Sequence, residues 1–332
     1  MQRVRLIDVA ERAGVSMKTV SNVVRGYVHV RPEMRARVQA AIEELGYRPN
    51  VTARRLVSGR TGMLALALPE MDQPYFAELA RHVASLAPEF GYRVLIEQTL
   101  LDADAERAVL HDRDNGVVDG VLFHPARMPN SEIAALRSRY PLVLFAEDPP
   151  ATADSVMMDN AVAAQQAIAY LVTAGRRRIS YLGTADDDGS QASTPRLAGY
   201  HLGLDSAGVA AADRAVIACT DYSAEATHAA LASALSGGLQ TDAILCREDR
   251  CAIGALRALT EAGLSVPADV ALISWDDTHL AQWSTPQLSS IRPDKAEMAR
   301  TALRMVHDRI EGYQGPGRHV VVDHELIVRD ST

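Results

Sequence analysis

Hydrogen-bonding side chains line one face of a short segment near the start of the chain. Counted at helical spacing, Val20, Val23 and Val24 fall together on the opposite face. The exposed face carries polar or long side chains, namely Met17, Lys18, Ser21, Asn22 and Arg25. A short helix with an apolar back and a hydrogen-bonding front fits the major groove of double-stranded DNA. The pattern therefore predicts a helix that reads nucleic acid.

Catalytic and metal-dependent chemistry finds little support in the residue pattern. The chain has no nucleophile elbow, P-loop, glycine-rich dinucleotide fingerprint or metal-ligand spacing. We therefore expect no catalytic residue, no metal site and no cofactor. The sequence predicts that the protein is not an enzyme. The acidic run Asp186, Asp187 and Asp188 is compatible with a cation site but is better interpreted as an exposed loop.

Three helices must position the predicted DNA-reading face. The first has an apolar stripe at helical spacing, formed by Leu6, Val9, Ala10 and Ala13. Gly14 permits the left-handed turn that ends it, and Ser16 is a favourable N-cap for the helix that follows. Pro32 opens the third helix at a tolerated position. Its inward stripe is formed by Val38, Ala41, Ile42 and Leu45.

The distribution of charge separates this segment from the rest of the chain. Residues 1–60 contain twelve Lys and Arg and five Asp and Glu, a net charge of +7. The remaining residues carry −15, which leaves −8 for the whole chain. A basic segment attached to an acidic body indicates a polyanionic partner for that segment alone.

Two stretches of this segment resemble the DNA-binding headpiece of the lactose-repressor (LacI/GalR) family of bacterial regulators. They are DVAERAGVSMKTVS, residues 8–21, and AIEELGYRPN, residues 41–50. The resemblance implies that Met17, Lys18 and Asn22 contact base edges of operator DNA. By the same resemblance, residues placed for phosphate contacts are Ser16, Thr19 and Ser21. Many relatives have serine where Arg31 precedes the third helix, and Arg31 is either a phosphate contact or an ordinary exposed arginine.

A basic tether, residues 49–60, follows the headpiece. Asn50 could cap a helix of about two turns there, and a helix that short is marginal in water. We therefore expect it to fold on DNA. The resemblance implies that Leu56, beside Arg54 and Arg55, wedges between base pairs in the minor groove. The alternative is that Leu56 packs on the body of the protein.

The body alternates short aliphatic runs with helical stretches, as in parallel sheets covered on both faces. Predicted strands are 63–68, 93–97, 120–123, 142–145, 179–182, 243–246 and 270–275. Predicted helices are 75–90, 160–174, 196–207, 224–235, 249–262 and 295–311. The predicted fold is a small all-α helix-turn-helix headpiece followed by an α/β core of two parallel-sheet lobes.

The body also resembles the periplasmic-binding-protein-like core of the same family, most extensively in GALRALTEAGLSVPADVALISWDD, residues 254–277. The resemblance implies a headpiece over 1–48, a hinge over 49–60 and a core over 61–332. The first lobe would comprise about 61–160 and 292–320, and the second about 161–291 and 321–332. In open α/β sheets ligands bind at the carboxyl ends of strands, so an effector is expected between the lobes.

Effector contacts follow from the resemblance where the sequences match. They are Tyr75, Phe76, Arg196, Tyr222 and Asp276. A guanidinium fork and a carboxylate can bracket a small polar molecule from opposite sides. Trp275 and Trp283 are each either a further aromatic contact or a core residue.

Two acids mark departures from relatives in the expected cleft. Glu248 replaces a common asparagine, and Glu147 lies near a position where relatives use an acid. Both favour a ligand rich in hydroxyl or amine donors, and a neutral sugar fits best. His124, after the third predicted strand, either reaches the cleft or is a surface-loop histidine, and the second interpretation is the simpler.

The predicted protein is a transcriptional repressor whose affinity for near-palindromic operator DNA changes when a sugar binds. It would be a homodimer or a tetramer. We expect a bacterial cytoplasmic location and no membrane partner. The three cysteines lack metal-ligand spacing, the sequence starts without a secretory signal, and it contains no long apolar run. The alternatives are a corepressor-dependent regulator or an activator with a ligand such as a nucleobase. A transport binding protein is a further alternative, which the basic segment opposes.

Overall fold

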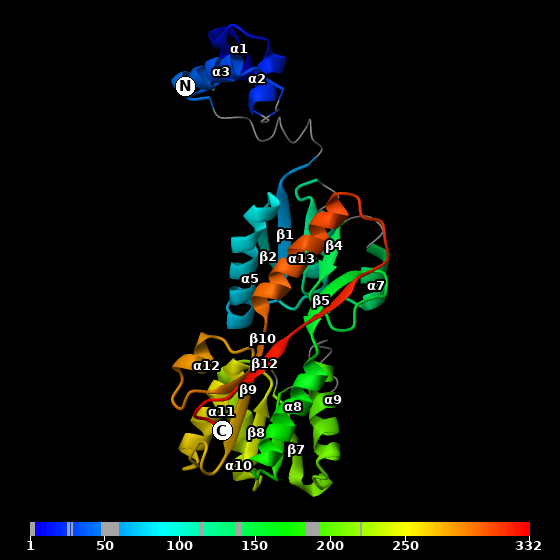
Figure 1. Cartoon of the computed structure of the whole chain (residues 1–332). Helices are drawn as coiled ribbons and strands as arrows, with labels where there is room; N and C mark the ends of the chain where they lie inside the picture. Colours follow the sequence, from blue (N-terminus) through cyan, green and yellow to red (C-terminus); the bar gives the residue numbers. More distant parts are fainter. Residues whose placement is uncertain are drawn as a thin grey trace. The chain divides into compact units, whose positions relative to one another are not determined.

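The computed structural model describes residues 4–24, 27, 29–47, 60–112, 116–136, 141–183, 193–219 and 221–332. The chain divides into two compact units, Met1–Thr61 and Gly62–Thr332, and most of their helices and strands are labelled in Figure 1. Several predicted features lie outside the described residues, namely Arg25, Asn50, Arg54, Leu56, the hinge before Arg60 and the acidic run at 186–188.

The first unit contains the predicted helices, α1 (Leu6–Ala13), α2 (Met17–Val24) and α3 (Pro32–Leu45). Gly14 has a φ of 62°, and this left-handed turn lets the N–H of Val15 donate to the carbonyl of Ala10 at 3.0 Å. The buried side chains of the unit are Val9, Ala10, Ala13, Val20, Val23, Val38, Ala41 and Tyr47. The predicted helix-turn-helix headpiece is therefore confirmed.

The first sheet of the second unit is entirely parallel and has the order β11-β5-β4-β3-β1-β2. Its strands are β1 (Met63–Leu68), β2 (Arg93–Gln98), β3 (Gly120–Phe123), β4 (Leu142–Leu144), β5 (Asp154–Met158) and β11 (His319–Val322). One face packs against α5 (Pro74–Leu86), which continues as a 3-10 turn η1 (Ala87–Phe90), and α13 (Lys295–Ile310). The other face packs against α6 (Ala103–Asp112) and α7 (Asn130–Leu136).

The second sheet has the order β12-β10-β9-β8-β6-β7, with only β12 antiparallel to its neighbour among the described strands. Its strands are β6 (Ile179–Leu182), β7 (Arg214–Ile217), β8 (Ala243–Cys246), β9 (Ala271–Trp275), β10 (Ser289–Pro293) and β12 (His324–Ile327). Helices α8 (Asn160–Thr173) and α9 (Ser193–Ser206) cover one face. The other carries α10 (Ala224–Ser236), α11 (Asp249–Glu261) and α12 (His279–Trp283), and a 3-10 turn η4 (Ala211–Asp213) precedes β7.

The chain passes between the two lobes three times, after Met158, after Pro293 and after Val322 (Figure 1). Strand β10 pairs with β12 as far as Pro293, and β11 pairs with β5 as far as Val322. The expected lobe boundaries at about 292 and 321 therefore lie about two residues before the observed crossings. We call 62–158 with 295–322 the first lobe, and 160–293 with 324–332 the second.

Close helix packing in the second lobe depends on glycine. A Cβ atom at Gly199 of α9 would lie 2.2 Å from the carbonyl oxygen of Ala161 in α8. A Cβ at Gly254 of α11 would lie 2.3 Å from the carbonyl oxygen of Ala224 in α10. The missing side chains let each helix pair approach closely.

None of the helices in the described ranges combines the length and apolarity that a membrane crossing requires.

Candidate functional site

Helix α2 presents the predicted DNA-reading face. Met17 and Lys18 are exposed, whereas Val20 and Val23 on the opposite side are buried. The remaining predicted contacts on the helix, Thr19, Ser21 and Asn22, are half-buried.

Ser16 caps α2, because its Oγ accepts a hydrogen bond from the N–H of Thr19 at 3.1 Å. The Oγ of Ser16 and the Oγ1 of Thr19 are also 2.9 Å apart. These two hydroxyls therefore stabilise the start of the helix, in addition to any role at a phosphate.

Arginines elsewhere in the headpiece join its helices. The Nη2 of Arg12 lies 2.6 Å from Glu44 Oε2, and the Nη2 of Arg37 donates to the carbonyl of Ala13 at 2.6 Å. Arg31 is the N-cap of α3, and its exposed side chain makes no capping hydrogen bond within the described residues. Arg12 and Arg37 thus fix α1 to α3, while Arg31 leaves the first turn of α3 without a side-chain acceptor.

A cavity that is partly open to solvent lies between the two lobes, at the carboxyl ends of strands from both sheets. The first lobe contributes Pro69, Glu70, Gln73, Tyr75, Phe76, Leu101, His124, Pro125, Ala126, Arg127 and Met157. The second contributes Arg196, Tyr222, Arg247, Glu248 and Asp276. Six of the eight expected effector contacts therefore line one cavity, and Glu147 and Trp275 do not.

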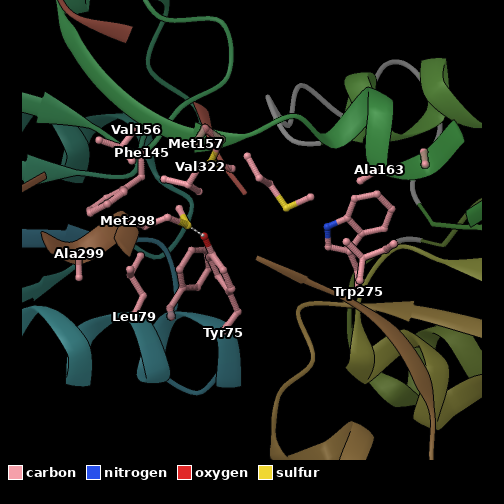
Figure 2. Close-up of a cluster of buried hydrophobic side chains, with 14 of the residues drawn as sticks. Tyr75, Leu79, Phe145, Val156, Met157, Ala163, Trp275, Met298, Ala299 and Val322 are labelled. Carbon is pink, nitrogen blue, oxygen red and sulfur yellow. Dashed lines mark hydrogen bonds between the residues drawn. The ribbon is translucent and has the colours of Figure 1, made fainter. Parts of the chain in front are cut away.

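An aromatic wall covers the first-lobe side of this cavity. Tyr75 and Phe76, in the first turn of α5, meet edge to face with ring centroids 5.2 Å apart, and Phe76 meets His124 at 4.9 Å. The hydroxyl of Tyr75 donates to Met298 Sδ at 3.9 Å, so the ring is fixed on the lobe (Figure 2).

His124 belongs to the cavity and not to a surface loop, which corrects the sequence interpretation. Burial lowers the pKa of His124 to about 4, so its imidazole is neutral at pH 7. Its Nδ1 is buried and has no hydrogen-bond partner among the described residues. A neutral imidazole in this position can donate to or accept from a ligand hydroxyl, according to its tautomer.

Arg196 is the centre of the second-lobe wall. Its Nε donates to Asn160 Oδ1 at 2.9 Å, and its Nη1 donates to the carbonyl of Arg247 at 2.6 Å. Its Nη2 lies 3.8 Å from Asp276 Oδ1. Burial raises the pKa of Asp276, and the positive charge of Arg196 opposes that shift.

Glu147 and Trp275 support Arg196 from outside the cavity lining. Glu147 Oε1 accepts from the backbone N–H of Asn160 at 2.7 Å and also from its side-chain amide, and Asn160 in turn holds Arg196. Trp275 is fully buried, with the guanidinium carbon of Arg196 4.5 Å from its ring centroid. Neither side chain is in the cavity lining, because both pack behind the arginine, and a direct contact with a ligand stays a prediction for them. Trp283 is 85% exposed and is also not in the lining.

The carboxylate of Glu248, which was expected to favour a donor-rich ligand, already accepts hydrogen bonds from protein donors. Its Oε2 accepts from Arg247 Nη1 at 2.8 Å and from Gln73 Nε2 at 2.6 Å. Its Oε1 accepts from Arg250 Nε at 2.9 Å. Burial raises the pKa of Glu248, and Arg247 and Arg250 oppose that shift.

Gln73 and Arg247 are cavity residues that the sequence did not single out. The guanidinium carbon of Arg247 lies 3.4 Å from the centroid of the Tyr222 ring, which joins two lining residues into one surface. Gln73 precedes Pro74 at the start of α5, and Arg247 directly follows β8. Both residues follow a buried strand, β1 and β8 respectively, and this position in the sequence could have identified them as cavity residues.

Polar contacts connect the lobes beside the cavity. Gln73 of the first lobe donates to Glu248, and Arg250 Nη2 of the second donates to Glu70 Oε2 at 3.2 Å. We call Glu70, Gln73, Glu248 and Arg250 the interlobe bridge. A second connection is made by Glu78, whose Oε1 accepts from the backbone N–H of His279 at 3.2 Å. In the described ranges, no cluster of three or more His, Cys, Asp or Glu is arranged to hold a metal ion.

Comparison with known proteins gives two family matches along the chain. Residues 5–50 match the family described as bacterial regulatory proteins, lacI family, and residues 168–332 match the periplasmic binding protein-like domain. Catabolite control protein A of Priestia megaterium is 30% identical over 332 residues, which covers 99% of this chain and 99% of that protein.

Among the solved structures that resemble this chain over almost its whole length are two regulators with a bound small molecule. The lac repressor dimer bound to operator and the anti-inducer ONPF has 25% sequence identity and a TM-score of 0.89, over 99% of each chain. The complex of the transcriptional regulator CelR with cellobiose has 28% identity and a TM-score of 0.73, over 99% of this chain and 100% of that one.

Proposed function

Because the chain belongs to the LacI family of bacterial regulatory proteins, we propose that it is a transcriptional repressor whose operator affinity is set by a small molecule bound between the lobes. The proposal rests mainly on the interlobe cavity, which is lined by residues near the strand ends of both lobes. The same chain also contains a helix-turn-helix headpiece. As with its relatives, its role is regulation and not catalysis.

A neutral sugar is the proposed effector class. The cavity lining contains three arginines and three acidic residues, so it offers no net charge to an ionic ligand. Tyr75, Phe76 and Tyr222 supply apolar surfaces suited to sugar faces, and Arg196 with Asp276 supplies hydrogen bonds from opposite sides. The complex of CelR with cellobiose supports a sugar in this fold.

The headpiece residues proposed to contact DNA are Ser16, Met17, Lys18, Thr19, Ser21, Asn22, Arg25, Arg31, Asn50, Arg54 and Leu56. Base edges would be contacted by Met17, Lys18 and Asn22, and phosphates mainly by the hydroxyls and arginines. A homodimer would present two such headpieces to the half-sites of a near-palindromic operator. The proposed location is the bacterial cytoplasm, where the operator is.

The interlobe bridge gives the cavity a means of acting on the headpiece. A ligand that takes the place of the Gln73 amide at Glu248 Oε2 breaks a contact between the lobes, because Gln73 belongs to the first lobe. Ligand occupancy and lobe separation are therefore coupled, and a difference in affinity between two lobe arrangements shifts operator affinity by linkage. Couplings of this kind typically change affinity by roughly 5- to 150-fold.

The test is a thermal-shift screen of the full chain against neutral mono- and disaccharides, with nucleobases and nucleosides as a second panel. A sugar that stabilises the protein and changes its affinity for operator DNA supports the proposal. A hit confined to nucleobases favours the alternative ligand class, and hits without any effect on operator affinity contradict the regulatory role.

Arg196→Ala separates effector binding from DNA binding. The variant should lose the effect of the sugar found in the screen while it keeps the operator affinity of the ligand-free protein. Arg257→Ala is the control, because Arg257 is an exposed arginine on α11 outside the cavity lining. Loss of operator affinity without ligand in Arg196→Ala would contradict the assignment.

A further inference from the structure

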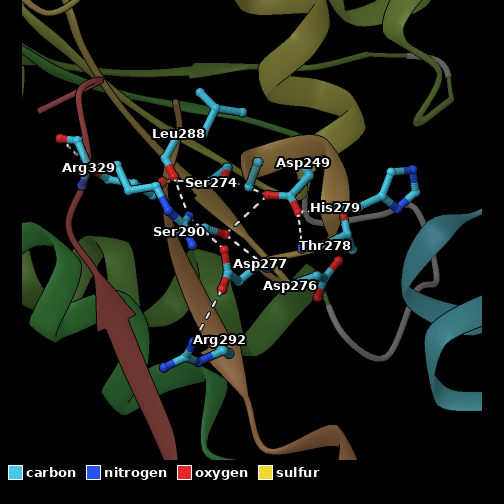
Figure 3. Close-up of polar contacts among 12 residues, drawn as sticks. Asp249, Ser274, Asp276, Asp277, Thr278, His279, Leu288, Ser290, Arg292 and Arg329 are labelled. Carbon is cyan, nitrogen blue, oxygen red and sulfur yellow. Dashed lines mark hydrogen bonds and ion pairs between the residues drawn. The ribbon is translucent and has the colours of Figure 1, made fainter. Parts of the chain in front are cut away.

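The loop that follows β9 has an unusual backbone at the cavity. Asp276 and Asp277 have φ values of 90° and 44°, in the left-handed region that non-glycine residues rarely adopt. The Asp276 side chain lines the cavity, whereas the Asp277 side chain is fully buried. Figure 3 shows the two carboxylates on different sides of the loop. The backbone conformation therefore decides which carboxylate faces the cavity.

An ion pair on the far side of the loop holds Asp277. Its Oδ1 lies 2.6 Å from Nη1 of Arg329, whose side chain is 14% exposed. Arg329 is itself fixed, because its Nη1 donates to the carbonyl of Leu288 at 2.7 Å and its backbone N–H donates to Ser289 Oγ at 2.8 Å. Arg292 faces the other oxygen of Asp277, but at 3.7 Å and with 45% of its side chain exposed.

The residues on either side of Asp276 and Asp277 are also anchored. Asp249 Oδ2 accepts from the N–H of Thr278 at 2.7 Å and from its Oγ1 at 2.8 Å. Asp249 Oδ1 accepts from Ser274 Oγ at 2.5 Å. The N–H of Asp276 donates to the carbonyl of Ile291 at 2.8 Å. The backbone of the two residues is held as well, because the N–H of Asp277 donates to Ser290 Oγ at 3.0 Å and Lys295 Nζ donates to the carbonyl of Asp276 at 2.7 Å. The Asp277–Arg329 ion pair adds the contact that fixes the Asp277 side chain on the side away from the cavity.

We propose that Asp277 and Arg329 are positioning residues of the effector site, whose ion pair holds the loop so that the Asp276 carboxylate faces Arg196. Neither side chain is among the described residues that line the cavity. The inference depends on the proposed function at one point, because it treats Asp276 as a residue that contacts the effector. It extends the site to a segment near the end of the sequence that no ligand would touch.

Trp275 provides a reporter for this arrangement. It directly precedes Asp276, is fully buried, and has the Arg196 guanidinium carbon 4.5 Å from its ring centroid. The sequence contains only one other tryptophan, the exposed Trp283. In a Trp283→Phe background, the fluorescence of Trp275 therefore reports where the Arg196 charge lies.

The experiment compares Asp276→Asn, Asp277→Asn, Arg329→Gln and Arg329→Lys in that background, without ligand. Asp276→Asn should change the Trp275 emission because Arg196 loses its counter-charge. Asp277→Asn and Arg329→Gln should give a change of the same sign and at least half the size, and Arg329→Lys should restore most of the parental signal. Arg292→Gln is the matched control and should resemble the parent.

Hydrogen exchange supplies a second readout that does not depend on the tryptophan. The amides of Asp277 and Thr278 should exchange at least tenfold faster in Arg329→Gln and Asp277→Asn, while those of β9 keep their protection. Parental emission and parental loop exchange in these two variants would overturn the proposal, as would an Asp276→Asn variant with unchanged emission. Since no ligand is present, failure here and failure of the sugar screen are distinguishable.

Discussion

Asp154 is expected to be the most sensitive ionic position in the first lobe. Its buried carboxylate accepts from Arg309 Nε at 2.9 Å and Nη2 at 2.7 Å, from Arg318 Nη2 at 2.8 Å, and from the N–H of Arg318 at 2.9 Å. Tyr313 covers both guanidinium groups, with 4.5 Å from its ring centroid to each central carbon. The side chain of Asp154 thus joins the start of β5 to the end of α13 and to the residue before β11.

Asp154→Asn keeps the shape of the side chain but removes its charge and turns an amide N–H toward a guanidinium. Removing one partner of a buried ion pair typically costs about 3–5 kcal/mol. We expect the lower end, about 3 kcal/mol, because Arg318 keeps a second partner, with Arg318 Nη1 2.7 Å from Asp308 Oδ2. Arg309, whose side chain is only 10% exposed, would keep its charge without this counter-charge.

Urea unfolding at pH 7 measures this cost, and Glu132→Gln is the matched control. Glu132 also makes a two-pronged contact with an arginine in the first lobe, at 2.8 and 3.0 Å from Arg107, but both side chains are substantially exposed. Exposed pairs of this kind contribute little to stability. A midpoint shift for Asp154→Asn no larger than that for Glu132→Gln would refute the reasoning.

The pH dependence of Asp154 has a definite sign. Burial alone would raise the pKa of Asp154, but the hydrogen bonds from Arg309 and Arg318 outweigh it and lower the pKa. An acid with a depressed pKa stabilises the fold above its unfolded value, and the contribution is lost as pH falls through the folded value. The stability difference between the native sequence and Asp154→Asn should therefore shrink as the pH is lowered below about 4.

Two further predictions concern the second lobe. Gly199→Ala should lower the free energy of unfolding of the second lobe by about 1–3 kcal/mol, because the new Cβ would lie 2.2 Å from the Ala161 carbonyl oxygen. Leu202→Ala is the control, since Leu202 is 51% exposed on the same helix, and it should lower the stability measured by urea unfolding much less. Burial raises the pKa of Asp249 to about 7, so between about pH 4 and 7 the folded protein holds a proton that the unfolded chain releases. Stability should therefore fall more steeply with rising pH in the native sequence than in Asp249→Asn, and equal slopes would contradict this.

The strands that the sequence predicted are those with continuous apolar runs. The prediction of 63–68 coincides with β1, in which every residue after Met63 is buried. Strands β7, β11 and β12 were not delimited because each lies at the edge of its sheet and has only one fully buried residue or none, so no continuous apolar run marks it. Strand β5 was missed because it opens with Asp154, whose burial depends on Arg309 and Arg318 from distant parts of the chain.

The candidate site was predictable at the level of strand ends but not of side-chain direction. Tyr75, Phe76, Arg196, Tyr222 and Asp276 line one cavity, and they were carried over from matching family strings. Glu147 and Trp275 also lie at strand ends, but their side chains pack behind Arg196. Periodicity and family position do not state which way a side chain turns once the chain has left the strand.

Glu248 shows the second limit, which comes from partners supplied by the other lobe. From sequence, a glutamate in place of asparagine favours a ligand rich in hydrogen-bond donors, whereas in the structure Gln73, Arg247 and Arg250 already donate to its oxygens. Gln73 is 175 residues away in sequence. No local pattern marks such a contact, because it depends on how the two lobes meet.

The ion pairs of the cavity limit the charge of the ligands that can bind there. Arg196 is matched by Asp276, and Glu248 by Arg247 and Arg250, so an ionic ligand would bring a charge into the cavity without a waiting partner. Burying an uncompensated charge is costly. A polyhydroxylated neutral molecule needs only to exchange hydrogen bonds, for example by replacing the Gln73 amide at Glu248 and by meeting the neutral imidazole of His124. The first of these exchanges would break a contact between the lobes, so under the proposed function a hydrogen bond that recognises a sugar also acts on the interlobe bridge.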